Sequence, residues 1–180
     1  MKAGDKMEAK TKAGITVKDL CLMGIMVAII EVCKVTLEAL PNIELTSFWL
    51  IMFTLFWGRK VAYVVPAFIL IEGCMYGFNT WWFMYLYALP LLVLITHFFR
   101  KQDSAIFWSM VSSMFGFAFG FLCSFVYYII GLVDGDFFAG FTWWIAGIPM
   151  DIIHGISNFV LMLVLYKPVR AVLERMRKLI

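Results

Sequence analysis

Charged residues are scarce in this chain. They make up 15% of its 180 residues, whereas hydrophobic residues make up 63% and the mean hydropathy is +0.91. Soluble domains carry about 25% charged residues, so this composition excludes an ordinary soluble globular protein. It predicts an integral membrane protein, because a chain of this length suffices for about six spans of roughly 20 residues each.

The motifs of several chemistries are also missing. The sequence contains no zinc or haem motif, no nucleotide-binding motif and no nucleophile-elbow sequence, and its four cysteines lie at irregular spacing in apolar stretches. We therefore expect no metal, no cofactor bound by this chain, no enzymatic activity and no nucleic-acid partner. The apolar spans leave no room for an ATPase domain, so any ATP would be hydrolysed by another chain.

The apolar sequence divides into six runs separated by short polar or glycine-containing connections. We predict an all-α bundle of six transmembrane helices (18–166) in the lipid bilayer, between a polar N-terminal segment (1–17) and a basic tail (167–180). The expected spans are 18–38, 45–57, 61–78, 81–99, 105–132 and 141–166. The second run is short for a hydrocarbon core of about 30 Å. We therefore expect the connection before it to lie below the membrane surface, sheltered by protein, as part of a binding site.

The positive charges are grouped and predict the orientation. Of the fifteen Lys and Arg residues, five lie at or before Lys18, two at 59–60, two at 100–101 and five from Lys167 onward; only Lys34 lies elsewhere. With six spans, all four groups fall on one side, and such residues are enriched in cytoplasmic loops. We therefore expect both termini in the cytoplasm. The opposite loops are 39–44, 79–80 and 133–140.

Several ionisable side chains fall inside the predicted spans, where they are costly unless they face protein or a wet cavity. Glu31, Lys34 and Glu38 share one stripe of the first helix. Together with acids, amides and aromatic residues in the outer halves of other spans, they predict a pocket open to the outside. The candidate pocket residues are Glu31, Lys34, Glu38, Asn42, Glu44, Glu72, Tyr76, Asn79, Trp82, Tyr85, Trp144, Asp151 and His154.

These charged residues also have a purely structural interpretation. Glu31, Lys34 and Glu38 can form an internal ion-pair stripe, and Glu72 can be the partner of Lys34 from a neighbouring helix. The two interpretations are compatible for Glu72, since a ligand could also be held by that pair.

Asp151 and His154 leave four interpretations open: a metal site, a catalytic acid–base pair, a hydrogen-bonded structural pair and ligand contacts. A metal needs three or four convergent ligands, and nucleophilic catalysis needs an activated Ser, Cys or Thr beside the base. The tryptophan pairs 81–82 and 143–144 fit the aromatic belt of a membrane interface. They would stack on a ligand only if one member of each pair turned inward.

Two pairs of small residues have the spacing that lets helices approach closely, Gly24 with Ala28 and Gly116 with Gly120. Packing inside the bundle is one interpretation of each pair. Because the first pair lies near the cytoplasmic end of its helix, we interpret it as a surface on which another membrane protein docks.

Three long segments and the early small-residue motif resemble a known family. The segments are LPNIELTSFWLIMFTLFWGRKVAY, IEGCMYGF–WWFMYLYALPLLVL and WWIAGIPMDIIHGISNF, and the likeness covers nearly the whole chain after Val17. In these segments the chain resembles the substrate-binding S-components of energy-coupling factor (ECF) transporters. The resemblance implies a multi-pass protein of a bacterial plasma membrane that captures a scarce, vitamin-like solute from outside.

The same resemblance implies partners. An S-component associates with a membrane coupling protein and two ATP-binding-cassette ATPases, and it topples in the membrane when they cycle. In that family the small-residue motif of the first helix contacts the coupling protein. The resemblance implies the same role here for Gly24 and Ala28. Gly24 stands where alanine is most typical.

The outer half-spans hold five acids against Lys34 alone. This excess favours a cationic or amine-bearing ligand, and the aromatic residues suit a flat heterocycle. A carboxylate-bearing ligand could still use Lys34. The alternatives to a solute-capture subunit are a membrane-embedded enzyme using Asp151 and His154, and an autonomous proton-coupled secondary transporter.

Overall fold

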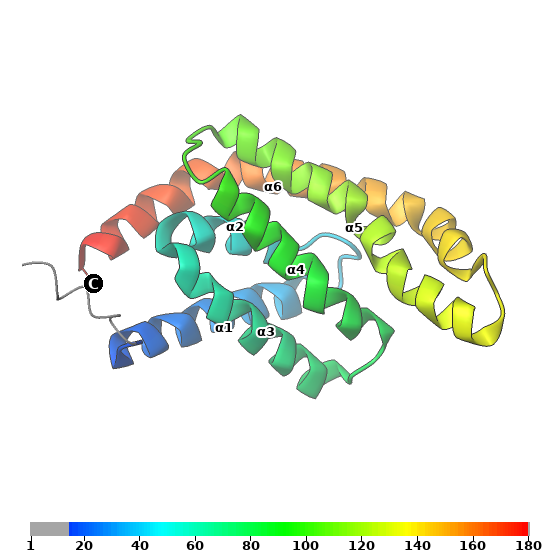
Figure 1. The fold of residues 1–180 in the computed structure, drawn as a ribbon. Coiled ribbons are helices and arrows are strands. Elements are labelled where there is room, and N and C mark those ends of the chain that lie inside the picture. The colour runs from blue at the N-terminus through cyan, green and yellow to red at the C-terminus, as the bar shows by residue number, and fades with distance from the viewer. Residues whose placement is uncertain (1–14, 180) are drawn as a thin grey trace, which may run out of the picture.

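The computed structural model describes residues 15–179, and all the regular secondary structure in this part of the chain is helical (Figure 1). The all-α prediction is therefore confirmed for these residues. Most of the expected N-terminal segment (1–14) and the last residue of the basic tail lie outside the described part. The helices, in order, are α1 (Val17–Leu37), α2 (Thr46–Trp57), the short 3-10 helix η1 (Gly58–Lys60), α3 (Val61–Tyr76), α4 (Thr80–Phe98), α5 (Ala105–Asp134) and α6 (Ala139–Leu179).

Five helical segments are long and apolar enough to cross a membrane, as expected for a membrane-embedded protein. One of them, Thr46–Tyr76, takes α2, η1 and α3 together as 31 residues. The other four are α1, α4, α5 and α6, the last of which continues without a break through most of the expected basic tail.

The short helix α2 is the core of the bundle. Its 12 residues measure about 18 Å, less than the thickness of a bilayer, and eight of them are buried. It contacts all the other α-helices. Because neighbouring helices cover most of its surface, α2 is predominantly apolar and needs no charged face toward water.

The longest helices, α5 and α6, lie against each other along their length, and their hairpin extends farthest to the right in Figure 1. Glycines allow this close approach. A Cβ on Gly116 would lie 2.9 Å from the backbone of Gly155, and one on Gly120 would lie 2.2 Å from the carboxylate of Asp151. Gly116 and Gly120 therefore pack inside the bundle.

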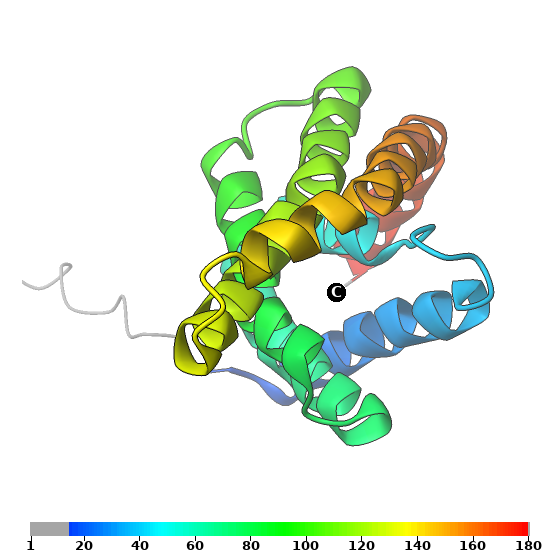
Figure 2. The same cartoon turned by 90° about the vertical axis from the view of Figure 1, so that its right-hand side faces the viewer.

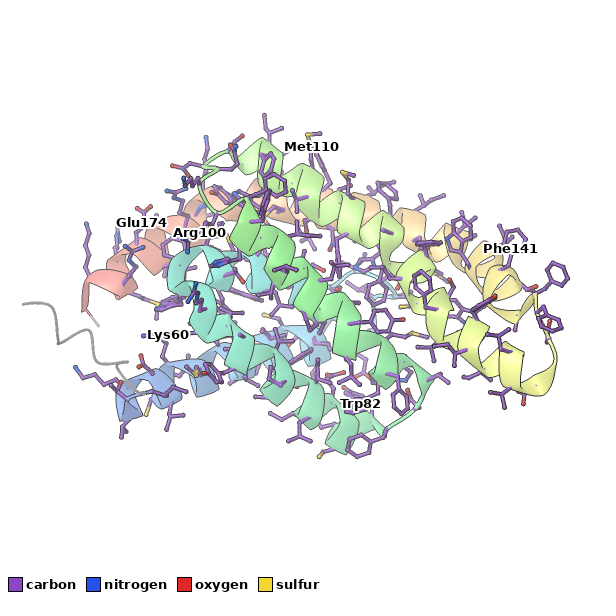
Figure 3. The ribbon with its side chains drawn as sticks, viewed as in Figure 1. Lys60, Trp82, Arg100, Met110, Phe141 and Glu174 are labelled. Atoms are coloured by element: carbon purple, nitrogen blue, oxygen red, sulfur yellow. The ribbon has the colours of Figure 1, made fainter. Side chains whose placement is uncertain are left out.

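Apart from Lys34, the basic residues that form the described ion pairs lie at one end of the bundle. Lys60 in η1 forms an ion pair with Asp19 at the start of α1, and Arg170 near the end of α6 pairs with Asp103 after α4. The labelled Lys60 and Arg100 lie at this end in Figure 3, whereas Trp82 and Phe141 lie toward the other. These ion pairs join the start of α1 to η1 and the last part of α6 to the connection after α4. Each of these four segments carries one of the groups of positive charge that the sequence predicts on one side of the membrane.

Candidate functional site

A cavity of about 320 Å³ lies between five helices, away from the basic end. In Figure 2, which views the bundle from that direction, α1, the α3–α4 hairpin and the α5–α6 hairpin lie around one centre. The volume is in the range of small-molecule sites. The lining residues are Lys34, Leu37, Glu38, Leu40, Pro41, Asn42, Ile43, Glu44, Tyr76, Trp81, Tyr85, Phe119 and His154.

The connection from α1 to α2 forms one wall of the cavity, and its conformation depends on Asn42. Asn42 has φ +57°, the one left-handed non-glycine residue in the described chain, and asparagine tolerates this conformation better than most residues. Its carbonyl accepts a hydrogen bond of 3.1 Å from Ser157 Oγ on α6. The sequence indicates a role in ligand binding for Asn42, and the structure adds this backbone role.

A second contact fastens the same connection to α6. His154 Nε2 lies 3.2 Å from Glu44 Oε1, and Ser47 Oγ donates to the same carboxylate oxygen at 3.2 Å. Burial raises the pKa of the Glu44 carboxyl, but the interaction with His154 and the nearby hydroxyl groups lower it more, so the net pKa lies below its usual value. The ring of His154 is buried edge-on against Phe119, with centroids 5.2 Å apart.

Lys34 occupies an aromatic box beside the cavity. Its Nζ lies 4.9 Å from the ring centroid of Tyr76, 5.3 Å from that of Trp81 and 5.4 Å from that of Tyr85. It also forms an ion pair with Glu72, which is completely buried on α3. The structural interpretation of Glu72, a partner for Lys34 from a neighbouring helix, is therefore correct.

The carboxylates near this box have unused hydrogen-bonding capacity. Glu72 uses Oε2 for Lys34, and its Oε1 has no hydrogen-bond partner within residues 15–179. Both carboxylate oxygens of Glu31, one turn before Lys34, are buried and likewise unpartnered in that range. Glu38 is exposed and lines the cavity. This cluster of acids around one lysine can accept several donors from a ligand.

No known protein family, curated protein or solved structure matches this chain.

The structure brings most of the expected pocket residues together. Those that line the cavity are Lys34, Glu38, Asn42, Glu44, Tyr76, Tyr85 and His154. Glu72 lies directly behind Lys34, and Glu31 shares its helix face. Neither Glu72 nor Glu31 is part of the lining, and the other four expected residues, Asn79, Trp82, Trp144 and Asp151, lie outside it as well.

Two of these four residues, Asn79 and Trp82, belong to α4 and its N-terminal cap. The Asn79 side chain caps this helix by accepting hydrogen bonds from the backbone N–H groups of Trp81 and Trp82. The side chain of Trp82 packs against α3, where its Nε1 donates to the carbonyl of Ile69 at 2.7 Å, and the absence of a side chain at Gly73 makes room for it. Asparagine before a helix is itself a capping signal, which could have predicted the first of these roles.

The other two outside residues belong to the α5–α6 pair. Trp144 packs edge-on against Phe121, with centroids 5.2 Å apart. Asp151 is buried, and its Oδ1 accepts a hydrogen bond of 2.9 Å from the backbone N–H of Gly120. Asp151 and His154 thus have different partners, Gly120 and Glu44. Within residues 15–179, no group of three His, Cys, Asp or Glu side chains is placed to hold a metal.

Sequence reasoning did not single out several lining residues. Trp81, rather than Trp82, lines the cavity, and so does Phe119 of α5. The sequence positions of Trp81 and Trp82 relative to Tyr76 could not show which of the two tryptophans lines the cavity. Phe119 lies in an apolar run in which nothing distinguishes it from Phe115 or Phe117.

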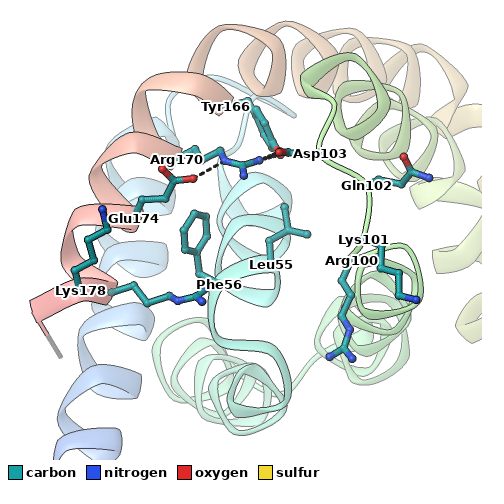
Figure 4. Close-up of a pocket in the computed structure, with 11 residues that line it drawn as sticks. Leu55, Phe56, Arg100, Lys101, Gln102, Asp103, Tyr166, Arg170, Glu174 and Lys178 are labelled. Atoms are coloured by element: carbon teal, nitrogen blue, oxygen red, sulfur yellow. Dashed lines mark hydrogen bonds and ion pairs between the residues drawn. The ribbon is translucent and has the colours of Figure 1, made fainter.

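A larger cavity, of about 480 Å³, lies at the basic end (Figure 4). Its charged residues include Arg100, Lys101, Arg177 and Lys178, which are all exposed. Arg170 is already paired with Asp103 and Glu174. The charges are therefore solvated or satisfied, as at a membrane surface.

The small residues of α1 lie on the outside of the bundle. Gly24 and Ala28 are exposed, and a Cβ built on Gly24 would meet no atom within 4 Å. The apolar side chains of Leu20, Ile25 and Val32 beside them are exposed as well. This face is accordingly free of contacts with the described part of the chain.

Proposed function

We propose that this chain is the solute-binding subunit of an ATP-driven ECF-type importer in the plasma membrane of a bacterium. It captures a small, vitamin-like aromatic solute from the extracellular side and delivers it with a coupling protein and two ATPases. The observation that carries this proposal is the cavity walled by acids and aromatic residues, with the aromatic box of Lys34 beside it. Such a mixture of a few convergent polar groups with aromatic walls is typical of small-molecule sites.

The arrangement of charge supports an orientation for the proposed subunit. The basic ends of the helices lie together and the cavity lies away from them. Under the positive-inside rule the basic end faces the cytoplasm, so the cavity opens toward the outside. We propose that α2 and α3 cross the membrane separately, which gives six transmembrane helices with both termini in the cytoplasm.

The exposed face of α1 supports the proposed partner. Close helix–helix contact in membranes uses small residues, and Gly24 and Ala28 leave a flat strip that no residue from 15 to 179 covers. This strip lies in the half of α1 nearer its basic start, where a partner that couples to cytoplasmic ATPases would reach it.

The proposal is tested by identifying what the protein binds. The protein would be purified in mild detergent and denatured, and the released small molecules measured by mass spectrometry. Trp81→Ala should release clearly less of the bound compound, because the loss of a desolvated aromatic or cation–π contact of about 1–2 kcal/mol weakens binding about 5- to 30-fold.

The neighbouring tryptophan provides a matched control. Trp82→Ala removes the same type of side chain from a position outside the cavity. Size-exclusion chromatography would show that the variant is folded, and the folded variant should retain the compound. Equal loss from both variants would contradict the placement of the site. Uptake of the identified compound by this chain alone in proteoliposomes, driven by a proton gradient, would favour the secondary-transporter alternative.

A further inference from the structure

The aromatic box around Lys34 has the composition of a cation site. Tyr76, Trp81 and Tyr85 direct their rings at one ammonium group within 5.4 Å, and the ring of Phe68 lies 6.0 Å away. Faces of aromatic rings attract cations, and boxes of this kind recognise organic ammonium ligands. Here the group inside the box belongs to the protein itself.

The buried carboxylate oxygens around the box outnumber those that Lys34 contacts. Glu72 is completely buried with one oxygen unpartnered, and both buried oxygens of Glu31 are also unpartnered in the described chain. Buried carboxylate oxygens without donors are costly. A second donor-bearing cation, or one that brings more N–H groups than Lys34 does, would satisfy them.

Lys34 has a second acidic partner within reach outside the box. Its side chain is 21% exposed and lines the cavity, so it is not enclosed on all sides. Glu38, one turn further along α1, lines the same cavity and is within reach of a lysine four residues before it. The flexible four-carbon stem of lysine allows the ammonium to move between the two acids.

We propose that the ligand of this cavity is an organic cation whose positive group displaces the Lys34 ammonium from the aromatic box. Lys34 is then a tethered competitor: it neutralises the box when the cavity is empty and moves to Glu38 when the ligand binds. The inference names the ligand class for the site of the proposed function and depends on that function for its biological meaning. An anionic ligand, by contrast, would need Lys34 as its direct partner.

Chemical rescue tests the proposal without knowledge of the natural ligand. Lys34→Ala empties the box, and n-butylammonium can then enter it as an untethered replacement. Millimolar n-butylammonium should raise the thermal unfolding midpoint of this variant in detergent by about 2–4 °C, because a ligand that binds only the folded state stabilises it. The wild-type protein should respond less, since Lys34 already fills the site.

Two controls make the outcome specific. Sodium butyrate has the same chain with the opposite charge and should not stabilise Lys34→Ala. The double variant Lys34→Ala with Glu72→Gln retains the empty box without its buried charge and should lose most of the rescue. Equal shifts in the wild-type protein and in Lys34→Ala, or stabilisation by butyrate, would overturn the proposal.

The test remains decisive if Lys34→Ala does not fold alone. The variant would then be purified with n-butylammonium present throughout, and recovery of monodisperse protein by the cation but not by butyrate supports the proposal. Failure to recover it contradicts the proposal. If n-butylammonium rescues Lys34→Ala but no solute co-purifies with the wild-type protein, the cation site is supported and the proposed function loses its support. If a solute co-purifies but n-butylammonium gives no rescue, the proposed function is supported and the cation site is contradicted.

Discussion

At the scale of single residues, polar side chains that look alike in sequence have different roles in the structure. Glu44 and Glu72 lie at the cavity or beside its lysine, whereas Asn79 caps a helix and Asp151 binds a backbone N–H. A polar residue in an apolar helix must find a partner, but the partner can be a ligand, a side chain or another helix. Only the three-dimensional neighbours distinguish these cases.

Asn42 gives a prediction at this scale. Its positive φ of +57° costs an ordinary side chain about 1 kcal/mol, so Asn42→Ala should lower the unfolding midpoint in detergent by about 2–4 °C. Ligand affinity should fall as well, because the connection that lines the cavity loses its preferred conformation.

Glycine adopts the same backbone conformation without strain and supplies the control. Asn42→Gly should retain the wild-type midpoint within about 1 °C, since 1 kcal/mol corresponds to 2–4 °C in a chain of this size. If Asn42→Gly loses as much ligand affinity as Asn42→Ala, the amide side chain contacts the ligand directly, as the sequence predicts.

At the scale of elements, the α5–α6 pair positions one wall of the site. Its close contact depends on Gly116 facing Gly155, which follows His154 directly. The position of the imidazole near Glu44 therefore depends on how closely two helices approach, and the small-xxx-small spacing of α5 predicts that approach.

Gly116→Ala is the prediction for this pair. The new methyl group would lie 2.9 Å from the backbone of α6, so the helices must separate, at a cost of about 1–3 kcal/mol. The unfolding midpoint should fall by several degrees, and ligand affinity should fall with it as His154 moves.

Gly147 on α6 is the matched position. A Cβ there would meet no atom within 4 Å, so Gly147→Ala should leave both the midpoint and the affinity unchanged or slightly increased, because alanine favours the helix. An unchanged midpoint in Gly116→Ala would show that the two helices do not approach as closely as described.

At the scale of the whole molecule, the proposed ligand site and the exposed small-residue strip occupy different parts of the bundle. The cavity uses the last turn of α1 from Lys34 onward, and the strip uses Gly24 and Ala28, which lie earlier in the same helix. Binding and docking should therefore be separable by mutation.

Gly24→Leu tests this separation. Leucine at an open position should leave the unfolding midpoint and the co-purifying compound unchanged, while it removes the flat strip. Co-purification with a co-expressed ECF coupling protein and its ATPases, and ATP-dependent uptake into cells, should both be lost. Gly147→Leu, which adds the same side chain at another open position, should preserve both. Uptake at the wild-type rate by Gly24→Leu would contradict the docking role.

Much of the fold could be predicted from the sequence because its determinants are local. Apolar runs, helix caps such as Thr16 with Asp19, and the four groups of positive charge depend on neighbouring residues and on the cost of burying charge. The α1 stripe of Glu31, Lys34 and Glu38 follows in the same way from helical periodicity, and so does the expectation that it faces other helices.

The orientation of each helix about its own axis was decided only by the tertiary structure. Adjacent residues of an α-helix point about 100° apart, so Trp81 and Trp82 cannot both face one cavity, and the choice depends on Gly73 of α3 making room for Trp82. The convergence of three rings and Glu72 on Lys34 has the same origin. By itself the sequence determined a helical, apolar bundle with polar stripes, since those properties reside in single segments. Which stripes meet is a property of packing between segments far apart in the chain.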